Sequence, residues 1–207
     1  EQAVDATALH QSVKSIDKLS NSEARHLFTA LRKAANHPLL LRVHYRTEEV
    51  LNKISEVCLV YQHFGRECED LAKVRAEIEE FSDFDIHMLC LEYPDSLGKY
   101  ILPAEILYQS PKMCKLRKML PSLIAEGHHI LIFSQWTRIM DLLEVLMNDL
   151  SINFLRFDGS TQIKARQVMI DQFNTGKIPV FLLSTKAGGL GINLVQADTV
   201  ILHDLDF

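Results

Sequence analysis

The sequence predicts an α/β lobe with a parallel sheet, preceded by a helical segment. From residue 112 onward, short apolar runs rich in β-forming residues alternate with stretches whose apolar residues recur at the helical period. Upstream, only helical periods occur. Strand–helix–strand alternation requires right-handed crossovers, which produce a parallel sheet covered by helices on both faces. We therefore expect a helical appendage over residues 1–107 and the α/β lobe over residues 108–207.

The predicted elements follow from these periods. In the first half, helices are expected over residues 10–35, 47–62, 66–81 and 83–92. The first of them ends before Pro38, because the residue preceding a proline is pushed out of the α region. In the second half, strands are expected over residues 130–133, 154–157, 180–183 and 199–202. The helices between and before them are expected over residues 112–125, 137–149 and 162–173, with Ser160 or Thr161 as the cap of the last one.

Composition and charge exclude several classes of protein. The chain has 207 residues, 47% of them hydrophobic and 24% charged, which is typical of globular domains. No apolar stretch is long enough to cross a bilayer. The four cysteines contain no CxxC pair, so neither a zinc site nor a disulfide framework is indicated. The net charge is −5, but residues 108–207 hold 10 Lys/Arg against 9 Asp/Glu, so any contact with DNA requires a local patch in this half.

The glycine-rich loop after the third strand is the strongest candidate for ligand binding. Ligands of parallel sheets bind at the carboxyl ends of the strands, where this loop begins. Its three glycines allow positive φ angles and a close approach of the backbone to a ligand, while Thr185 and Lys186 supply a hydroxyl and a cation suited to phosphate. A tight strand-to-helix turn without a ligand explains the same residues equally well.

The other strand ends are less specific. After the first strand, Ser134 and Gln135 offer hydrogen-bonding groups beside Trp136, although a helix cap next to a buried tryptophan is the simpler explanation. After the second strand, Arg166 lies one turn into the following helix, where an ordinary surface arginine is favoured on residue type alone. His203 and Asp204 end the fourth strand without a nearby cysteine or second histidine, so we expect no metal site.

The sequence lacks the parts of a self-sufficient P-loop ATPase. There is no G-x-x-x-x-G-K-[ST] motif to cradle phosphates and no Asp-Glu dipeptide to hold Mg²⁺. We therefore expect no catalytic residue within these 207 residues, and no ATP hydrolysis by this chain alone.

As a set, the loop motifs resemble the second RecA-like lobe of Swi/Snf-type chromatin-remodelling ATPases of helicase superfamily two. The resemblance rests on Phe133-Ser134-Gln135, on Asp158-Gly159-Ser160-Thr161 with Arg166, on the run from Ser184 to Leu194, and on Ala197-Asp198-Thr199-Val200-Ile201. Upstream, residues 31–40 (LRKAANHPLL) are similar to a signature of the same family. Residues 83–90 (DFDIHMLC) are similar to a stretch of the SMARCAD-type remodellers.

The resemblance implies a motor that remodels nucleosomes in the nucleus by translocating on double-stranded DNA. ATP and Mg²⁺ would be held by a first RecA-like lobe, and the second lobe would close over the nucleotide. By the same match, Gly189, Gly191 and Asn193 face the nucleotide, and Phe207 couples the motor to DNA. The residues expected near DNA phosphates are Ser134, Gln135, Arg166, Thr185 and Lys186.

The chain departs from the family in two respects. It lacks the first lobe, and it stops before the arginine-rich motif that stabilises the transition state in this family. The resemblance therefore implies a DNA-dependent ATPase only for a longer protein that contains these parts. The alternative is a catalytically inactive scaffold lobe that binds protein partners through the acidic helices of residues 47–92.

Overall fold

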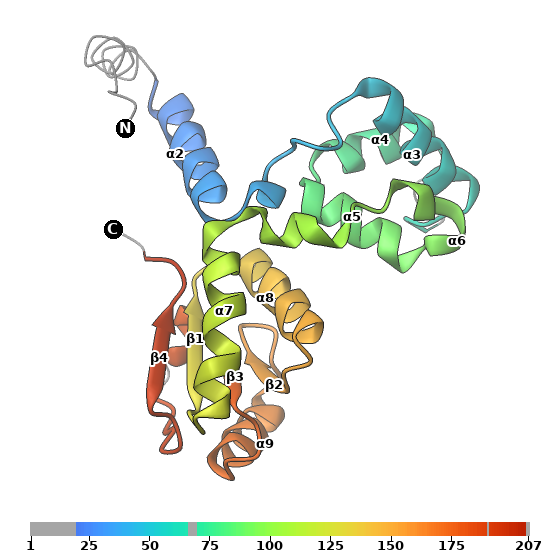
Figure 1. Ribbon diagram of the computed structural model, residues 1–207. Coiled ribbons are helices and arrows are strands. Elements are labelled where there is room, and N and C mark those ends of the chain that lie inside the picture. The colour runs from blue at the N-terminus through green and yellow to red at the C-terminus, as the bar shows by residue number, and fades with distance from the viewer. Residues whose placement is uncertain (1–19, 66–69, 190, 206–207) are drawn as a thin grey trace.

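The computed structural model describes residues 20–65, 70–189 and 191–205. Its centre is a four-stranded sheet, shown in Figure 1, in the order β2-β3-β1-β4. All three strand pairs are parallel. The strands are β1 (Ile130–Ser134), β2 (Phe154–Phe157), β3 (Val180–Ser184) and β4 (Thr199–Leu202). The predicted parallel α/β lobe is confirmed, and each predicted strand lies within one residue of the observed one.

Helices cover both faces of this sheet. Side chains alternate between the faces along each strand, so both faces present apolar side chains for helices to cover. Ile130 and Ile132 pack with α7 (Pro111–Ala125) and α8 (Thr137–Asp149) on one face. Leu131 and Phe181 pack on the other face with α9 (Ile163–Asn174) and the short α10 (Thr185–Gly188). Strands β1, β2 and β3 therefore supply apolar side chains to two separate cores, as their nearly continuous apolar runs predicted, whereas Val200 and Leu202 of β4 are exposed.

The predicted cap of α9 is wrong. The helix begins after Gln162, whose side chain makes no capping hydrogen bond. Thr161 instead accepts a hydrogen bond from the Asp158 amide through its hydroxyl (3.0 Å), and Ser160 donates its hydroxyl to the Asp158 carboxylate (2.6 Å). Both hydroxyls are used to close the turn after β2, so neither reaches the helix amides.

The first half is helical, as predicted. It contains α2 (Asn21–Asn36), α3 (Glu48–Val60), α4 (Leu71–Glu79), α5 (Asp83–Glu92) and α6 (Pro94–Leu97). Three short 3₁₀ turns connect them to each other and to the lobe: η1 (Pro38–Leu40), η2 (Gly98–Tyr100) and η3 (Ala104–Gln109). Ser20 is an extended N-cap that forms a capping box with Glu23, so the described part of the helix expected over residues 10–35 begins at Asn21. Residues 10–19 and 66–69 lie outside the described residues.

The helices α3–α6 form a protrusion with its own core. Ile54, Ile78 and Ile86 are fully buried in it, and Figure 1 shows these helices beside the sheet domain, with α2 projecting separately. Leu39 and Leu40 of η1 pack instead in the core of the lobe, as does Phe84 of α5. The lobe therefore uses residues on both sides of the expected boundary at residue 107. Among the described residues, no helix has the length and apolar character needed to span a membrane.

Candidate nucleic-acid and nucleotide interface

The loops that follow β1 and β3 begin side by side at the carboxyl edge of the sheet. Ser134 and Ser184, the last residues of these strands, are partners in the parallel register. Two of the predicted loops, far apart in sequence, thus share one edge of the sheet. This edge is where the ligands of open α/β sheets bind.

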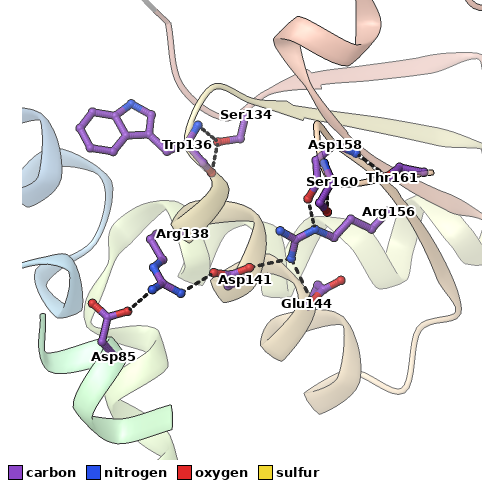
Figure 2. A network of polar contacts seen from close by, with 10 residues as sticks. All are labelled: Asp85, Ser134, Trp136, Arg138, Asp141, Glu144, Arg156, Asp158, Ser160 and Thr161. Atoms are coloured by element: carbon purple, nitrogen blue, oxygen red, sulfur yellow. Dashed lines mark hydrogen bonds and ion pairs between the residues drawn. The ribbon is translucent and has the colours of Figure 1, made fainter. Parts of the chain in front are cut away.

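The turn after β1 divides its two predicted site residues between interior and surface. Ser134 is fully buried, and its hydroxyl donates to Asp204 Oδ2 at 2.5 Å. It also accepts the Trp136 amide at 3.2 Å, so it closes the turn internally (Figure 2). Gln135 is exposed, and its backbone amide donates to Asp204 Oδ1 at 2.9 Å. Ser134 thus holds the turn, and Gln135 is the member of this pair that faces solvent.

The turn after β3 presents a cation. The hydroxyl of Ser184 accepts the Ala187 amide at 3.2 Å and caps α10. Within that short helix Thr185 is half-buried and Lys186 is exposed. The expectation of positive φ angles holds for Gly191 (69°) but not for Gly189 (−68°), which continues the right-handed turn. Only Gly191 therefore needs the conformational freedom of glycine for its observed backbone conformation.

Arg166 lies on a groove of about 720 Å³ between α9 and the segment after the glycines. Its guanidinium stacks over the Phe157 ring at 5.3 Å, and its Nε donates to the Thr161 carbonyl at 3.1 Å. Gly191 and Asn193 also line this groove. The structure therefore places an arginine predicted to face DNA on the same groove as two residues predicted to face the nucleotide.

A chain of ion pairs joins the protrusion to the turn after β2, and the sequence did not reveal it (Figure 2). Asp85 of α5 pairs with Arg138 at 2.8 Å, and Arg138 with Asp141 at 3.2 Å. Asp141 then pairs with Arg156 at 2.6 Å, and Arg156 with Asp158 at 2.7 Å. The sequence signals are weak. Arg138 and Asp141 share one helix turn, and Arg156 and Asp158 are two residues apart, but neither spacing indicates that the two pairs meet each other or Asp85.

The charges in this chain stabilise one another. Glu144 also contacts Arg156 at 3.1 Å, so three carboxylates surround one guanidinium. Burial opposes the charge of Arg156, but hydrogen bonds to Asp141 and Asp158 outweigh it and raise the pKa of the arginine. Burial likewise opposes ionisation of Asp158, but Ser160 and Arg156 lower the pKa of its carboxyl group. Arg156 is therefore held within the fold by three carboxylates.

The family-like residues 36–38 connect α2 to the lobe. Nδ1 of the fully buried His37 accepts the Leu39 amide (3.1 Å), which leaves the proton on Nε2 to donate to the Leu107 carbonyl (2.9 Å). Asn36 Oδ1 accepts a hydrogen bond from the Lys112 ammonium at 2.6 Å. The same ammonium donates to the carbonyl of His203 at 2.8 Å, just after β4. These residues fix α2, α7 and β4 relative to one another.

His203 gives the lobe a pH-dependent stability. Burial and the charge of Lys112 lower its pKa to about 4. Because this folded-state pKa lies below the unfolded value of 6.5, protonation favours unfolding. The stabilisation is complete above pH 6.5 and is lost as the pH falls toward 4, with a total of about 3 kcal/mol. Urea unfolding of wild type and His203→Gln at pH 7 and pH 5 measures this loss; an equal pH dependence in both proteins would contradict it.

Comparison with known proteins defines the class of this lobe. Residues 111–207 match the family model described as the helicase conserved C-terminal domain. Among solved structures, the C-terminal part of the Fun30 ATPase domain superimposes with a TM-score of 0.80 at 40% identity. That match covers 87% of this chain and 59% of the other. The α/β lobe therefore belongs to the helicase C-terminal domain family.

The curated relatives identify the group more closely. The chain is 40% identical over 201 residues to the ATP-dependent helicase FUN30 of Saccharomyces cerevisiae and 41% identical over 210 residues to protein CHROMATIN REMODELING 19 of Arabidopsis thaliana. These alignments cover 96% and 99% of this chain but 18% and 27% of the relatives. The mouse SWI/SNF-related regulator of chromatin, subfamily A containing DEAD/H box 1, is 42% identical over 199 residues. The resemblance to Swi/Snf-type remodellers of the SMARCAD type is thus confirmed.

Phe207, the residue expected to couple the motor to DNA, lies outside the described residues. The contacts with DNA and with the nucleotide that the resemblance implies for the other site residues stay predictions.

Proposed function

We propose that this chain is the second motor lobe of an ATP-dependent DNA translocase that remodels nucleosomes in the nucleus. The supporting observation is the carboxyl edge of the sheet, where exposed Gln135 and exposed Lys186 follow two adjacent parallel strands. An amide and an ammonium suit phosphate oxygens, which carry no sequence information. A motor that moves along any DNA sequence requires contacts of this kind.

The nucleotide would be shared with a first lobe that carries the P-loop and the acidic box. In this proposal ATP and Mg²⁺ bind mainly to that first lobe. Gly189, Gly191 and Asn193 would line the second side of the cleft, and Arg166 lines the same groove as Gly191 and Asn193. Arg166 would bind a phosphate group, which belongs either to DNA or to the nucleotide. Ser134 supports the turn, while Thr185 stays with Lys186 as a phosphate-facing residue.

Replacing Lys186 by alanine tests the DNA contact. In the full-length ATPase, we expect Lys186→Ala to reduce DNA-stimulated ATP hydrolysis more than basal hydrolysis, because it removes a contact with the track and leaves the nucleotide pocket intact. If Lys186 neutralises one phosphate, the slope of log K against log salt for duplex DNA should become shallower by about 0.9. ATPase titrations with and without DNA, at several salt concentrations, measure both quantities.

Lys177→Ala is the matched control. Lys177 is an exposed lysine just before β3, at the amino ends of the strands. Its replacement removes the same charge from a surface that is not expected to contact DNA. We expect it to leave the DNA stimulation nearly unchanged. Equal loss of basal and stimulated rates in Lys186→Ala would place the lysine in the nucleotide site, and identical behaviour of the two lysine variants would make Lys186 ordinary surface.

A further inference from the structure

We propose that Asp204 is a positioning residue that fixes the turn of residues 134–136 and so presents Gln135 to DNA. The role of the turn in DNA binding rests on the proposed function above; the positioning itself does not. Asp204 is 9% exposed and follows β4, whereas the turn follows β1. The residue thus acts from a neighbouring strand, 69 positions away from Gln135 in sequence.

The geometry follows from the pairing of β1 with β4. The two strands run parallel up to Phe133 and Leu202, and the His203 amide then donates to the Phe133 carbonyl at 2.9 Å. This bond carries the ladder one residue further and brings Asp204 against the turn. Both carboxylate oxygens are used: Oδ2 accepts the Ser134 hydroxyl at 2.5 Å, and Oδ1 accepts the Gln135 amide at 2.9 Å.

A second group balances the buried charge of this carboxylate. Lys112 of α7 lies close enough for its charge to interact with Asp204, and its ammonium is held by Asn36 and by the His203 carbonyl. Burial lowers the pKa of this lysine, and Asp204 opposes that change. A charged carboxylate makes stronger hydrogen bonds than a neutral acceptor, so the turn is held by two charge-assisted bonds. The turn is thereby fixed relative to α2, α7 and β4 together.

Electrostatics alone predicts the opposite effect from positioning. Removing a negative charge close to a phosphate-binding edge should strengthen DNA binding by Coulomb attraction. If Asp204 orders the turn, its removal should weaken binding instead, because Gln135 then has to be ordered when DNA binds. The sign of the change in affinity therefore separates the two roles.

Amide hydrogen exchange of the 207-residue chain tests the positioning directly. In Asp204→Ala, we expect exchange of the Gln135 amide to rise about tenfold or more, since a hydrogen bond to a charged group is lost. Asp204→Asn keeps one acceptor oxygen and should retain part of the protection. It also serves as the second variant if alanine impairs folding. Unchanged Gln135 exchange in both variants would overturn the proposal.

Asp198→Ala is the matched control. Asp198 lies just before the other end of β4, where its carboxylate accepts the His129 amide at 3.2 Å. Its loss should raise exchange of the His129 amide and leave Gln135 protected. A rise at Gln135 in Asp198→Ala would show general loosening of β4, which overturns a specific role for Asp204.

Duplex-DNA binding by the full-length protein completes the test. We expect Asp204→Ala to bind DNA several-fold more weakly than wild type, and Asp198→Ala to bind like wild type. Faster Gln135 exchange with unchanged or tighter DNA binding would overturn the link from Asp204 to DNA. If Lys186→Ala also leaves DNA binding unchanged, the proposed function itself fails, and the exchange result still decides whether Asp204 orders the turn.

Discussion

Arg156→Ala should lower the free energy of unfolding of this chain by about 3 kcal/mol, in the range found when one partner of a buried ion pair is removed. The side chain of Arg156 is 22% exposed, and the carboxylates of Asp141, Glu144 and Asp158 surround its guanidinium. Its removal leaves three carboxylates close together with no cation between them. Urea or thermal unfolding at neutral pH measures the loss.

Arg138→Ala is the control, taken from the same chain of ion pairs. Its side chain is 59% exposed, so its pairs with Asp85 and Asp141 are screened by water. Exposed pairs of this kind contribute at most about 1 kcal/mol. Comparable losses in the two variants would mean that the surroundings of Arg156 do not distinguish it from a surface arginine.

Asp83→Ala should have a comparable effect on the protrusion. Asp83 is fully buried, and its carboxylate accepts the amides of Val43 (2.7 Å), His44 (2.7 Å) and Tyr45 (3.0 Å). Alanine leaves three backbone donors without this acceptor, and the amide of the buried Tyr45 then becomes an unsatisfied donor, which costs about 1–3 kcal/mol. The two charge-assisted bonds to Val43 and His44 are lost as well. We therefore expect a loss of about 3 kcal/mol in unfolding experiments, together with faster amide exchange at residues 43–45.

The exposed Asp95 offers a control for that change. Asp95→Ala removes the same charge from the protrusion at its surface, and we expect a change within about 0.5 kcal/mol. Full protection of residues 43–45 in Asp83→Ala would show that the carboxylate does not hold this segment. The contacts of two carboxylates give the family-like stretch of residues 83–90 a physical role. Asp83 anchors the chain that enters the protrusion, and Asp85 pairs with Arg138 of the lobe.

The strands and helices of the lobe were predictable from the sequence because their apolar periods agree with their final environments. The four strands are apolar runs bounded by polar turns, with β1 and β3 the most deeply buried, and α7, α8 and α9 each bury one stripe. The order β2-β3-β1-β4 was not predictable, since a period reports which residues are buried but not which strand lies beside which. The start of α2 at Asn21 was missed because the apolar spacing continues across Ser20.

Within the candidate site, residue type and position at a strand end were informative, but side-chain direction was not. Lys186 and Gln135 are exposed, as a contact with DNA requires. Ser134 faces inward because its partner, Asp204, comes from a strand whose position the sequence did not reveal. Asp204 was missed as a structural residue for the same reason, because its partners are distant in sequence. Arg156 was missed because two of its three carboxylate partners, Asp141 and Glu144, come from another element, α8.

The separate core of the protrusion implies that the chain has two cooperative units of unfolding, the protrusion and the sheet with its helices. The α3–α6 core and the cores beside the sheet share few residues, and α5 spans the boundary with Phe84 on one side and Ile86 on the other. Local opening follows such boundaries in proteins, so the protrusion can open as a foldon while the sheet stays folded. Proteases and chaperones would then meet a partly open form whose exposed surface comes from the protrusion. The turns that would contact DNA would keep their structure in that form, because they belong to the unit that opens last.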